Sequence, residues 1–265
     1  MSTDEPPIPE LELTSTESPI PLWRELTWGA EWLRLRTSPI LWGFGVPRGR
    51  GEPVVSVPGF LGSDVYLTEL RTWLGRIGYT AHVSGIGRNS DCPDILYEKL
   101  LETIIAAAGR SDQRVSLVGH SLGGALARAA AITRPDLVSQ VITLGSPLRG
   151  MSANPLVVAL ARLVTRLVTD PKEHPRQHGD HVHDTSCSIQ VLTALQSPLD
   201  ASVRLTSIYS RTDGVVDWAS SVVDPPDRCI EVNATHIGLV VNPDVYRHIG
   251  AALATHQTAV DVDFE

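Results

Sequence analysis

A serine lies at the centre of a short glycine-rich motif, Gly119-His-Ser-Leu-Gly123, with the spacing G-x-S-x-G. An apolar run typical of a buried strand precedes it, and a Gly/Ala-rich run typical of a helix follows it. A tight strand-to-helix turn needs small neighbours, and both glycines satisfy this requirement. Such a turn raises the Ser121 hydroxyl above a sheet edge and directs the Leu122 amide and a helix N-terminus at the same point. These residues predict a nucleophilic serine beside an anion-stabilising amide.

A serine hydroxyl at its ordinary pKa is a weak nucleophile, so it needs a base that is itself held in place. His236 is the candidate base, because it lies in the loop after the last expected strand, whereas the two later histidines, His248 and His256, lie on the expected terminal helix. It precedes an apolar stretch, Ile237-Gly-Leu-Val-Val241.

An acidic residue is needed to orient the base, and two aspartates lie between the serine and the histidine at a suitable place. Asp213 directly follows an expected strand and precedes a glycine, so we expect it to meet His236 at the sheet edge. Asp217, four residues later and before Trp218, is the alternative; its carboxylate could instead bond backbone amides of the turn.

Strand and helix patterns alternate from residue 53 onward. Strands are expected at 53–57, 79–83, 114–118, 138–144, 203–210 and 228–232, and helices at 66–77, 94–109, 122–133 and 244–256. The alternation predicts an α/β fold with a mostly parallel central sheet and helices on both faces. Ser121, Asp213 and His236 would then meet at one edge of that sheet.

An insert at about 148–200 interrupts the alternation. Residues 155–168 have an apolar stripe and predict an amphipathic helix, and a polar, histidine-rich loop follows. We interpret the insert as a cap or lid over the site, whose helix would shelter an acyl chain; the alternative is a helix that packs on the core.

The N-terminal region divides into two parts. Residues 1–21 are rich in proline and predict a disordered or loosely attached arm. Residues 22–50 hold four of the six tryptophans, and the spacing of Trp28, Trp32 and Leu35 predicts a short helix before Pro39. We favour packing of this helix on the main domain; an apolar arm at a substrate entrance, or a membrane-surface contact, is the alternative. The catalytic domain would span 51–257, with an acidic tail at 258–265.

The chain has 265 residues and a formal charge of −8, so an ordinary globular protein is expected and nucleic acid is not expected as a partner. Neither a secretory signal nor an apolar run long enough to cross a bilayer is present, which predicts a cytoplasmic protein.

Metal and cofactor sites are not expected. The three cysteines include no C-x-x-C, which leaves at most one bridge open, such as Cys187 with Cys229. The loop from His174 to His183 lacks the i, i+4 histidine pair of a helical metal site, so a solvated or packing role is preferred.

The chain resembles the α/β-hydrolase superfamily, in particular compact bacterial serine lipases and esterases. The matching segments are 53–62, 119–124, 143–150, 207–216 and 235–239, spread in family order over residues 53–250. The resemblance implies the α/β-hydrolase fold. It also implies that Phe60 and Leu122 supply the two backbone N–H groups of an oxyanion hole. The family's His-Gly-x is here Pro58-Gly59-Phe60, which lacks a side chain that usually braces the loop.

The expected function is hydrolysis of carboxylic esters through an acyl-enzyme on Ser121, with no cofactor or metal. Two alternatives stay open: an acyltransferase on the same scaffold that passes the acyl group to an alcohol or amine, and a binding protein without activity. The expected partner is a small-molecule ester or a lipid, with transient contact to a lipid surface left open. The sequence does not indicate an oligomeric state.

Overall fold

A parallel β-sheet forms the centre of the computed structural model, which describes residues 20–149 and 189–262. The described strands lie in the order β2-β1-β3-β4-β5-β6, and every neighbouring pair is parallel. Their bounds are Pro53–Val57 (β1), Thr80–His82 (β2), Val115–His120 (β3), Val138–Leu144 (β4), Arg204–Tyr209 (β5) and Cys229–Glu231 (β6). The predicted α/β class and the parallel sheet are confirmed.

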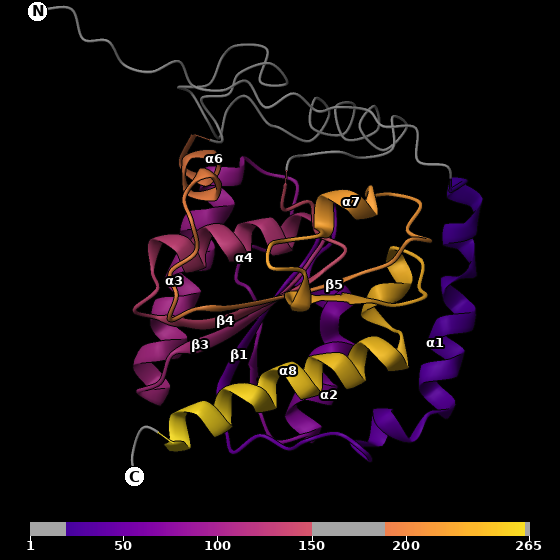
Figure 1. Cartoon of the computed structure of the whole chain (residues 1–265), viewed down its shortest axis with the longest axis horizontal. Coiled ribbons are helices and arrows are strands. Elements are labelled where there is room, and N and C mark those ends of the chain that lie inside the picture. The colour runs from indigo at the N-terminus through magenta and orange to yellow at the C-terminus, as the bar shows by residue number, and fades with distance from the viewer. Residues whose placement is uncertain (1–19, 150–188, 263–265) are drawn as a thin grey trace, which may run out of the picture.

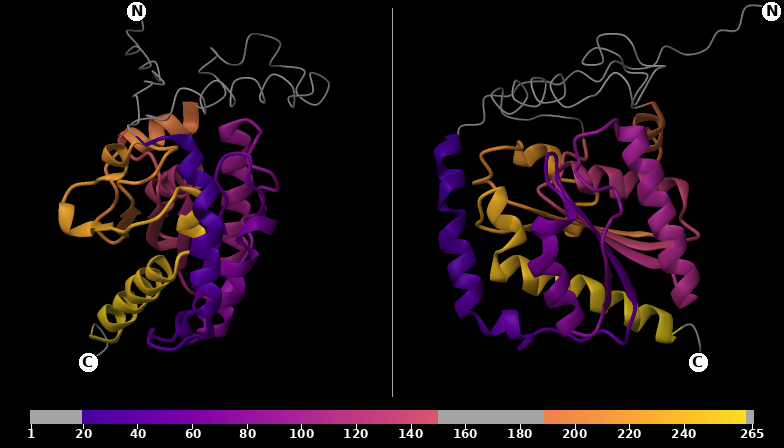
Figure 2. Two further views of the ribbon diagram at one scale, coloured as in Figure 1. Left: turned by 90° about the vertical axis from the view of Figure 1, so that its right-hand side faces the viewer. Right: turned by 180° about the vertical axis from the view of Figure 1, so that it is seen from behind.

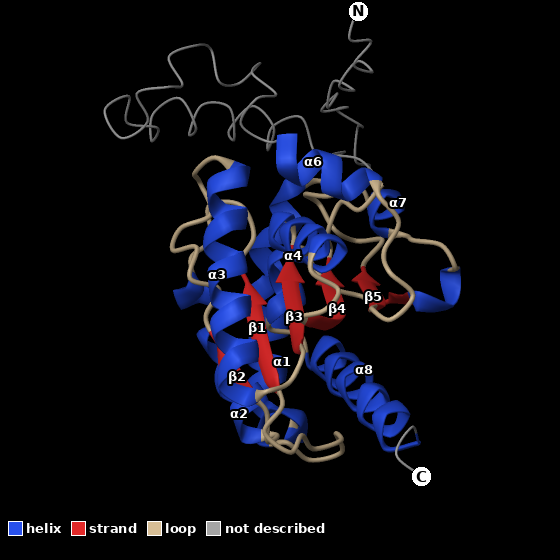
Figure 3. Ribbon diagram, turned by 90° about the vertical axis from the view of Figure 1, so that its left-hand side faces the viewer, coloured by secondary structure: helices blue, strands red, loops and turns tan. Residues whose placement is uncertain are grey.

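Helices flank the sheet on both sides (Figure 1, Figure 3). The α-helices are Trp28–Thr37 (α1), Thr68–Arg76 (α2), Pro93–Ser111 (α3), Leu122–Thr133 (α4), Ile189–Gln196 (α6), Trp218–Ser221 (α7) and Pro243–Val262 (α8). Short 3-10 helices are Leu22–Thr27 (η1), Pro39–Trp42 (η2), Asp64–Leu67 (η3), Pro226–Arg228 (η5) and Ile237–Val240 (η6). Helix α8 continues past the predicted end at residue 256 and into the segment expected to be an acidic tail.

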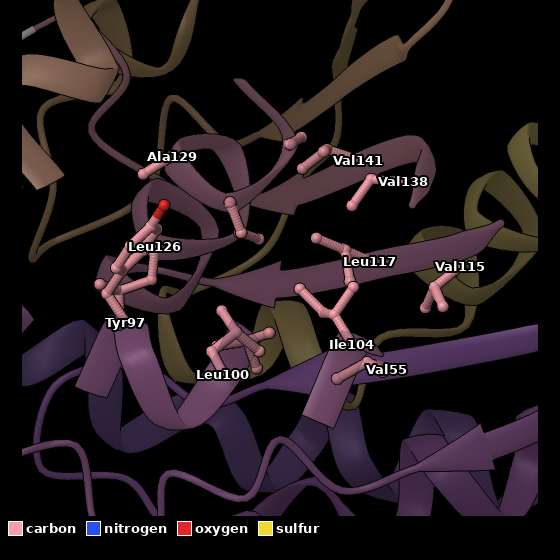
Figure 4. Packing of buried hydrophobic residues seen from close by; sticks show 14 of the residues in the cluster. Val55, Tyr97, Leu100, Ile104, Val115, Leu117, Leu126, Ala129, Val138 and Val141 are labelled. Carbon is pink, nitrogen blue, oxygen red and sulfur yellow. The ribbon is translucent and has the colours of Figure 1, made fainter. Parts of the chain in front are cut away.

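The strands bury side chains on both faces, which is why their sequences read as continuous apolar runs. On one face, Val55, Leu117 and Val141 pack with side chains of α3 and α4, among them Leu100 and Ile104 (Figure 4). On the opposite face, residues next to these in sequence pack against α2 and α8: Val54, Val118 and Ile142. The sheet is therefore held rigidly from both sides, and its carboxyl edge is a stable platform for loops.

The predicted insert is described only in part. The helix expected at 155–168 and the loop His174–His183 lie outside the described residues. The end of the insert forms α6, whose Val191 and Ala194 are buried in the same cluster as α3 and α4. This part of the predicted cap contributes to the hydrophobic core.

The expected tryptophan-rich helix is present as α1 and ends before Pro39. Its buried face differs from the predicted stripe, because Leu35 is fully buried whereas Trp28 and Trp32 are 40% and 36% exposed. The Trp32 Nε1–H donates to Glu69, and the Arg36 guanidinium lies over the Trp32 ring. Figures 1 and 2 show α1 along one side of the molecule, beside the segment that leads into α8.

Two of the three cysteines lie in the described residues, and their states differ. Cys229 is a free thiol whose Sγ accepts the Val223 N–H at 3.2 Å, so a bridge from it to Cys187 is excluded. Cys92, at the N-terminus of α3, is disulfide-bonded. Among the helices in the described part of the chain, none is long and apolar enough to cross a membrane.

Candidate active site

Ser121 lies on the turn between β3 and α4 with φ +53° and ψ −127°, a strained conformation for a residue with a side chain. The neighbouring glycines permit this turn. A Cβ at Gly119 would lie closer than 3.0 Å to Gly124, and one at Gly123 would meet the Val57 and Pro58 carbonyls at similarly short range. Only glycine fits at these two positions, so the sequence spacing has a steric cause.

Asp213 and His236 form a buried pair. His236 Nδ1 donates to Asp213 Oδ2 at 2.6 Å, and both side chains are almost completely shielded from solvent. The second carboxylate oxygen, Oδ1, accepts the N–H groups of Val215 and Val216 at 2.8 Å each. The aspartate is therefore fixed by the backbone of its own loop and orients the imidazole with the Nε2 edge left for other partners.

Asp217, the alternative acid, has a different role. It is the N-cap of α7, where its Oδ1 accepts the Ala219 N–H at 3.1 Å. This is the backbone bonding that the sequence suggested for it.

Ser121 and the Asp213–His236 pair are linked through His120. The His120 and His236 rings lie 4.6 Å apart between centroids, and His120 Nε2 donates to the His236 carbonyl at 3.0 Å. Within residues 20–149 and 189–262, no hydrogen bond joins Ser121 Oγ to the His236 ring. Direct proton transfer between the two thus requires that the ring and the hydroxyl come within hydrogen-bond distance, and such bonds often tighten only when substrate is bound.

The two histidines have opposite electrostatic environments. Burial lowers the pKa of His236, but the charge and hydrogen bond of Asp213 and the charge of Glu25 outweigh this effect, so its pKa is raised. Burial, reinforced by His236, lowers the pKa of His120 to about 3. His120 is therefore neutral at physiological pH, whereas His236 gains a proton readily.

Tyr66 braces the loop that follows β1. Its hydroxyl accepts the Gly59 N–H at 3.1 Å and contacts His120 Nδ1 at 2.6 Å. Asn89 holds the same loop, because its side-chain amide donates to the Pro58 carbonyl and its backbone carbonyl accepts the Leu61 N–H. These contacts hold the backbone of the loop at Pro58, Gly59 and Leu61.

Phe60 follows Gly59 in the loop after β1, and Leu122 follows Ser121 as the first residue of α4. Gly59 packs directly on the elbow, since a Cβ there would lie 2.9 Å from the Ser121 Cβ. In the part of the chain that the structure describes, neither the Phe60 nor the Leu122 N–H donates to a protein acceptor. Two unengaged N–H groups next to a serine are suited to bind an oxyanion.

Sequence analysis missed several residues that support the pair. Glu25 of η1 is buried, and its carboxylate accepts backbone N–H groups from both the aspartate loop and the histidine loop. Glu31 of α1 binds Thr235. The one signal in the sequence is that both glutamates lie within an apolar, tryptophan-rich segment, where a charged side chain is unexpected. The local pattern does not indicate their partners, which lie about 200 positions later in the chain.

A metal site is not seen in the described ranges, where no group of three or more His, Cys, Asp and Glu side chains is arranged to hold an ion. The histidine-rich loop lies outside these ranges.

Comparison with known proteins gives one family match and several bacterial relatives. Residues 95–216 match the family described as "PGAP1-like alpha/beta domain". A triacylglycerol lipase of Burkholderia plantarii is 32% identical over 46% of this chain and 37% of its own length, and one of Pseudarthrobacter phenanthrenivorans is 34% identical over 37% and 34%. The matched region thus spans little more than a third of either lipase.

Solved structures agree at the level of the fold. A metagenome-derived lipolytic enzyme superposes with a TM-score of 0.56 at 17% identity, covering 80% of this chain and 96% of the other. The Bacillus licheniformis lipase BlEst2 in mature form gives 0.52 at 16% identity, covering 79% and 94%. Together with the parallel sheet and the strained serine turn, these likenesses show that the chain has the α/β-hydrolase fold.

Proposed function

We propose that this protein is a serine hydrolase that cleaves carboxylic esters through an acyl-enzyme on Ser121. The observation that carries the proposal is the strained serine on its glycine-flanked turn, next to a buried His236–Asp213 pair. The names of the relatives, which are lipases and esterases, point to the same chemistry.

The mechanism begins with Ser121 Oγ, which attacks the acyl carbonyl carbon while His236 Nε2 takes its proton. Asp213 keeps the imidazole in the tautomer with Nδ1–H and stabilises the imidazolium that forms. The Phe60 and Leu122 N–H groups bind the oxyanion of the tetrahedral intermediate, each contributing on the order of 3 kcal/mol to barrier lowering.

Collapse of the intermediate breaks the bond to the alcohol, which receives the proton from His236 and leaves. Water then attacks the acyl-enzyme with His236 again as base, which releases the carboxylic acid and restores Ser121. These steps need no metal or cofactor.

The proposed substrate is an ester with an apolar acyl group, because the triacylglycerol lipases that the chain matches act on lipid esters by name. Those names do not favour transfer of the acyl group to another acceptor.

The test uses p-nitrophenyl esters from acetate to decanoate with the wild-type protein and Ser121→Ala. We expect the wild type to release p-nitrophenol and the folded variant to show only the background rate. Wild-type activity in a folded Ser121→Ala protein would contradict the proposal. Product analysis with added alcohol separates hydrolysis from acyl transfer.

A further inference from the structure

Glu25 is a buried acid that the mechanism above does not use. It lies on η1 and is 6% exposed, which is unusual for a glutamate. Its Oε1 accepts the N–H groups of Gly214 at 2.9 Å and His236 at 3.0 Å, and its Oε2 accepts the Ile237 N–H at 3.0 Å. Three backbone donors on one carboxylate offset the cost of its burial.

These three donors come from two separate loops. Gly214 follows Asp213 directly, whereas His236 and Ile237 belong to the loop after β6. The carboxylate therefore joins the two loops that carry the acid and the base, from a segment about 200 residues earlier in the chain. The Ser210 hydroxyl also accepts a backbone N–H from each loop, those of Thr212 and Ala234, but Ser210 is itself part of the aspartate loop, whereas Glu25 reaches both loops from a distant segment.

Glu31 adds a second contact from the same segment. Its Oε1 accepts the Thr235 N–H and hydroxyl at 2.8 and 2.9 Å, and its Oε2 accepts the Asn242 side-chain amide at 2.9 Å. A Cβ on Gly238 would collide with this carboxylate, so glycine is required for the close approach. Glu31 thus anchors the histidine loop alone, without touching the aspartate loop.

The charge of Glu25 also reaches the base. The charged or titratable groups that face His236 are Asp213 from the β5–α7 loop, Glu25 from η1 and His120 from the end of β3. Burial lowers the pKa of His236, and Asp213 first and Glu25 second raise it. A neutral amide at position 25 would keep one acceptor oxygen and lose the other, together with the charge.

We propose that Glu25 is a positioning residue for the active site. Its carboxylate acts as a clamp, which means that its two oxygens bind the Asp213 loop and the His236 loop and keep the two loops in a fixed relative position. The inference deepens the proposed function and rests on it, since the clamp acts through His236. It makes the N-terminal segment 22–37 part of the support of the site.

The test compares Glu25→Gln with the wild type in two measurements. We expect kcat for a p-nitrophenyl ester to fall roughly ten- to hundredfold with little change in KM, because small misplacement of reacting groups costs about this much. We also expect the His236 pKa, followed by NMR titration of the imidazole, to move to lower values because a neighbouring negative charge is lost.

Glu31→Gln is the matched control, because it removes the same charge from the same segment but from a contact with one loop only. We expect its His236 pKa to stay at the wild-type value. Glu25→Gln with wild-type kcat, or with an unshifted His236 pKa, would overturn the proposal. An equal shift of the His236 pKa in Glu25→Gln and Glu31→Gln would also overturn the proposal, because the shift would then not be specific to Glu25.

The proposal can still be tested if the wild type is inactive or if the Glu25→Gln variant does not fold. If the wild type has no esterase activity, the proposed function fails, whereas the titration and the hydrogen-exchange rates of the Gly214, His236 and Ile237 amides still test the clamp. If Glu25→Gln does not fold, Glu25→Asp replaces it. This variant keeps the charge but is too short for all three amides, so we expect a reduced kcat, and a wild-type kcat would overturn the clamp.

Discussion

The His120 ring packs against the His236 ring with 4.6 Å between centroids and 43° between the ring planes, and its Nε2–H donates to the His236 carbonyl at 3.0 Å. Because His120 is neutral and uses Nε2 as the donor, its Nδ1 must accept, and the Tyr66 hydroxyl 2.6 Å away is the donor. Burial raises the pKa of Tyr66, which keeps this proton in place. A chain of hydrogen bonds thus runs from the Gly59 amide through Tyr66 and His120 to the base loop.

Tyr66→Phe interrupts this chain. Without the hydroxyl, the Gly59 N–H and His120 Nδ1 lose their partner, so we expect a stability loss of about 1–3 kcal/mol and a lower kcat with little change in KM. Urea unfolding and steady-state kinetics measure the two effects. Tyr97→Phe is the matched control, because it removes a hydroxyl bonded to Thr133 on α4, away from the site. Equal kcat losses in the two variants would contradict a specific role for Tyr66.

His120 makes the protein less stable in acid. Its pKa is about 3 in the folded chain, below the ordinary value of 6.5, so the unfolded chain binds a proton in this range that the folded chain does not. The contribution of neutral His120 to the free energy of unfolding is therefore fully present above pH 6.5 and is lost as the pH falls toward 3. Urea titrations across this range in wild type and His120→Gln measure it. An identical pH dependence in both proteins would refute this assignment.

Asp213→Asn should remove most of the activity and Asp217→Asn should not. The asparagine cannot stabilise the imidazolium, and its amide can impose the wrong tautomer on His236, so we expect kcat to fall by roughly four orders of magnitude. Asp217 caps a four-residue helix, and its loss costs about 1 kcal/mol of stability. Kinetics and thermal unfolding of both variants test this, and comparable kcat losses would mean that the acid is not Asp213.

The pH dependence of kcat/KM should follow the His236 imidazole. Its pKa is raised above the ordinary 6.5, and only the neutral ring accepts a proton, so activity should be full at alkaline pH and fall with a midpoint above 6.5 as the pH decreases. A pH profile with a stable ester measures the midpoint. A midpoint below 6.5 would show that the raised pKa, or the base, is wrongly assigned.

Local patterns predicted the elements that hold the site. Each expected strand appears within a few residues of its predicted bounds, because apolar runs between turn signals report burial directly. The glycine spacing around Ser121 predicted the turn because backbone crowding leaves no room for a side chain. Asp213 could be preferred to Asp217 from its place directly after β5, and the structure brings it to His236.

Contacts between distant segments could not be predicted in this way. The tryptophan spacing indicated a helix at α1 but also a buried aromatic stripe, whereas the helix buries Leu35, bonds to Thr235 through Glu31 and leaves Trp32 partly exposed. Glu25 meets its partners 189 to 212 positions later, and no periodicity carries that information.

The central claim is that Ser121 is a nucleophile activated by His236. Labelling with a fluorophosphonate probe, followed by intact mass and peptide mapping, tests it most directly. We predict a single adduct on Ser121 in the wild type, none in Ser121→Ala, and strongly slowed labelling in His236→Ala. An adduct on another residue, or unchanged labelling in the folded His236→Ala variant, would contradict the account.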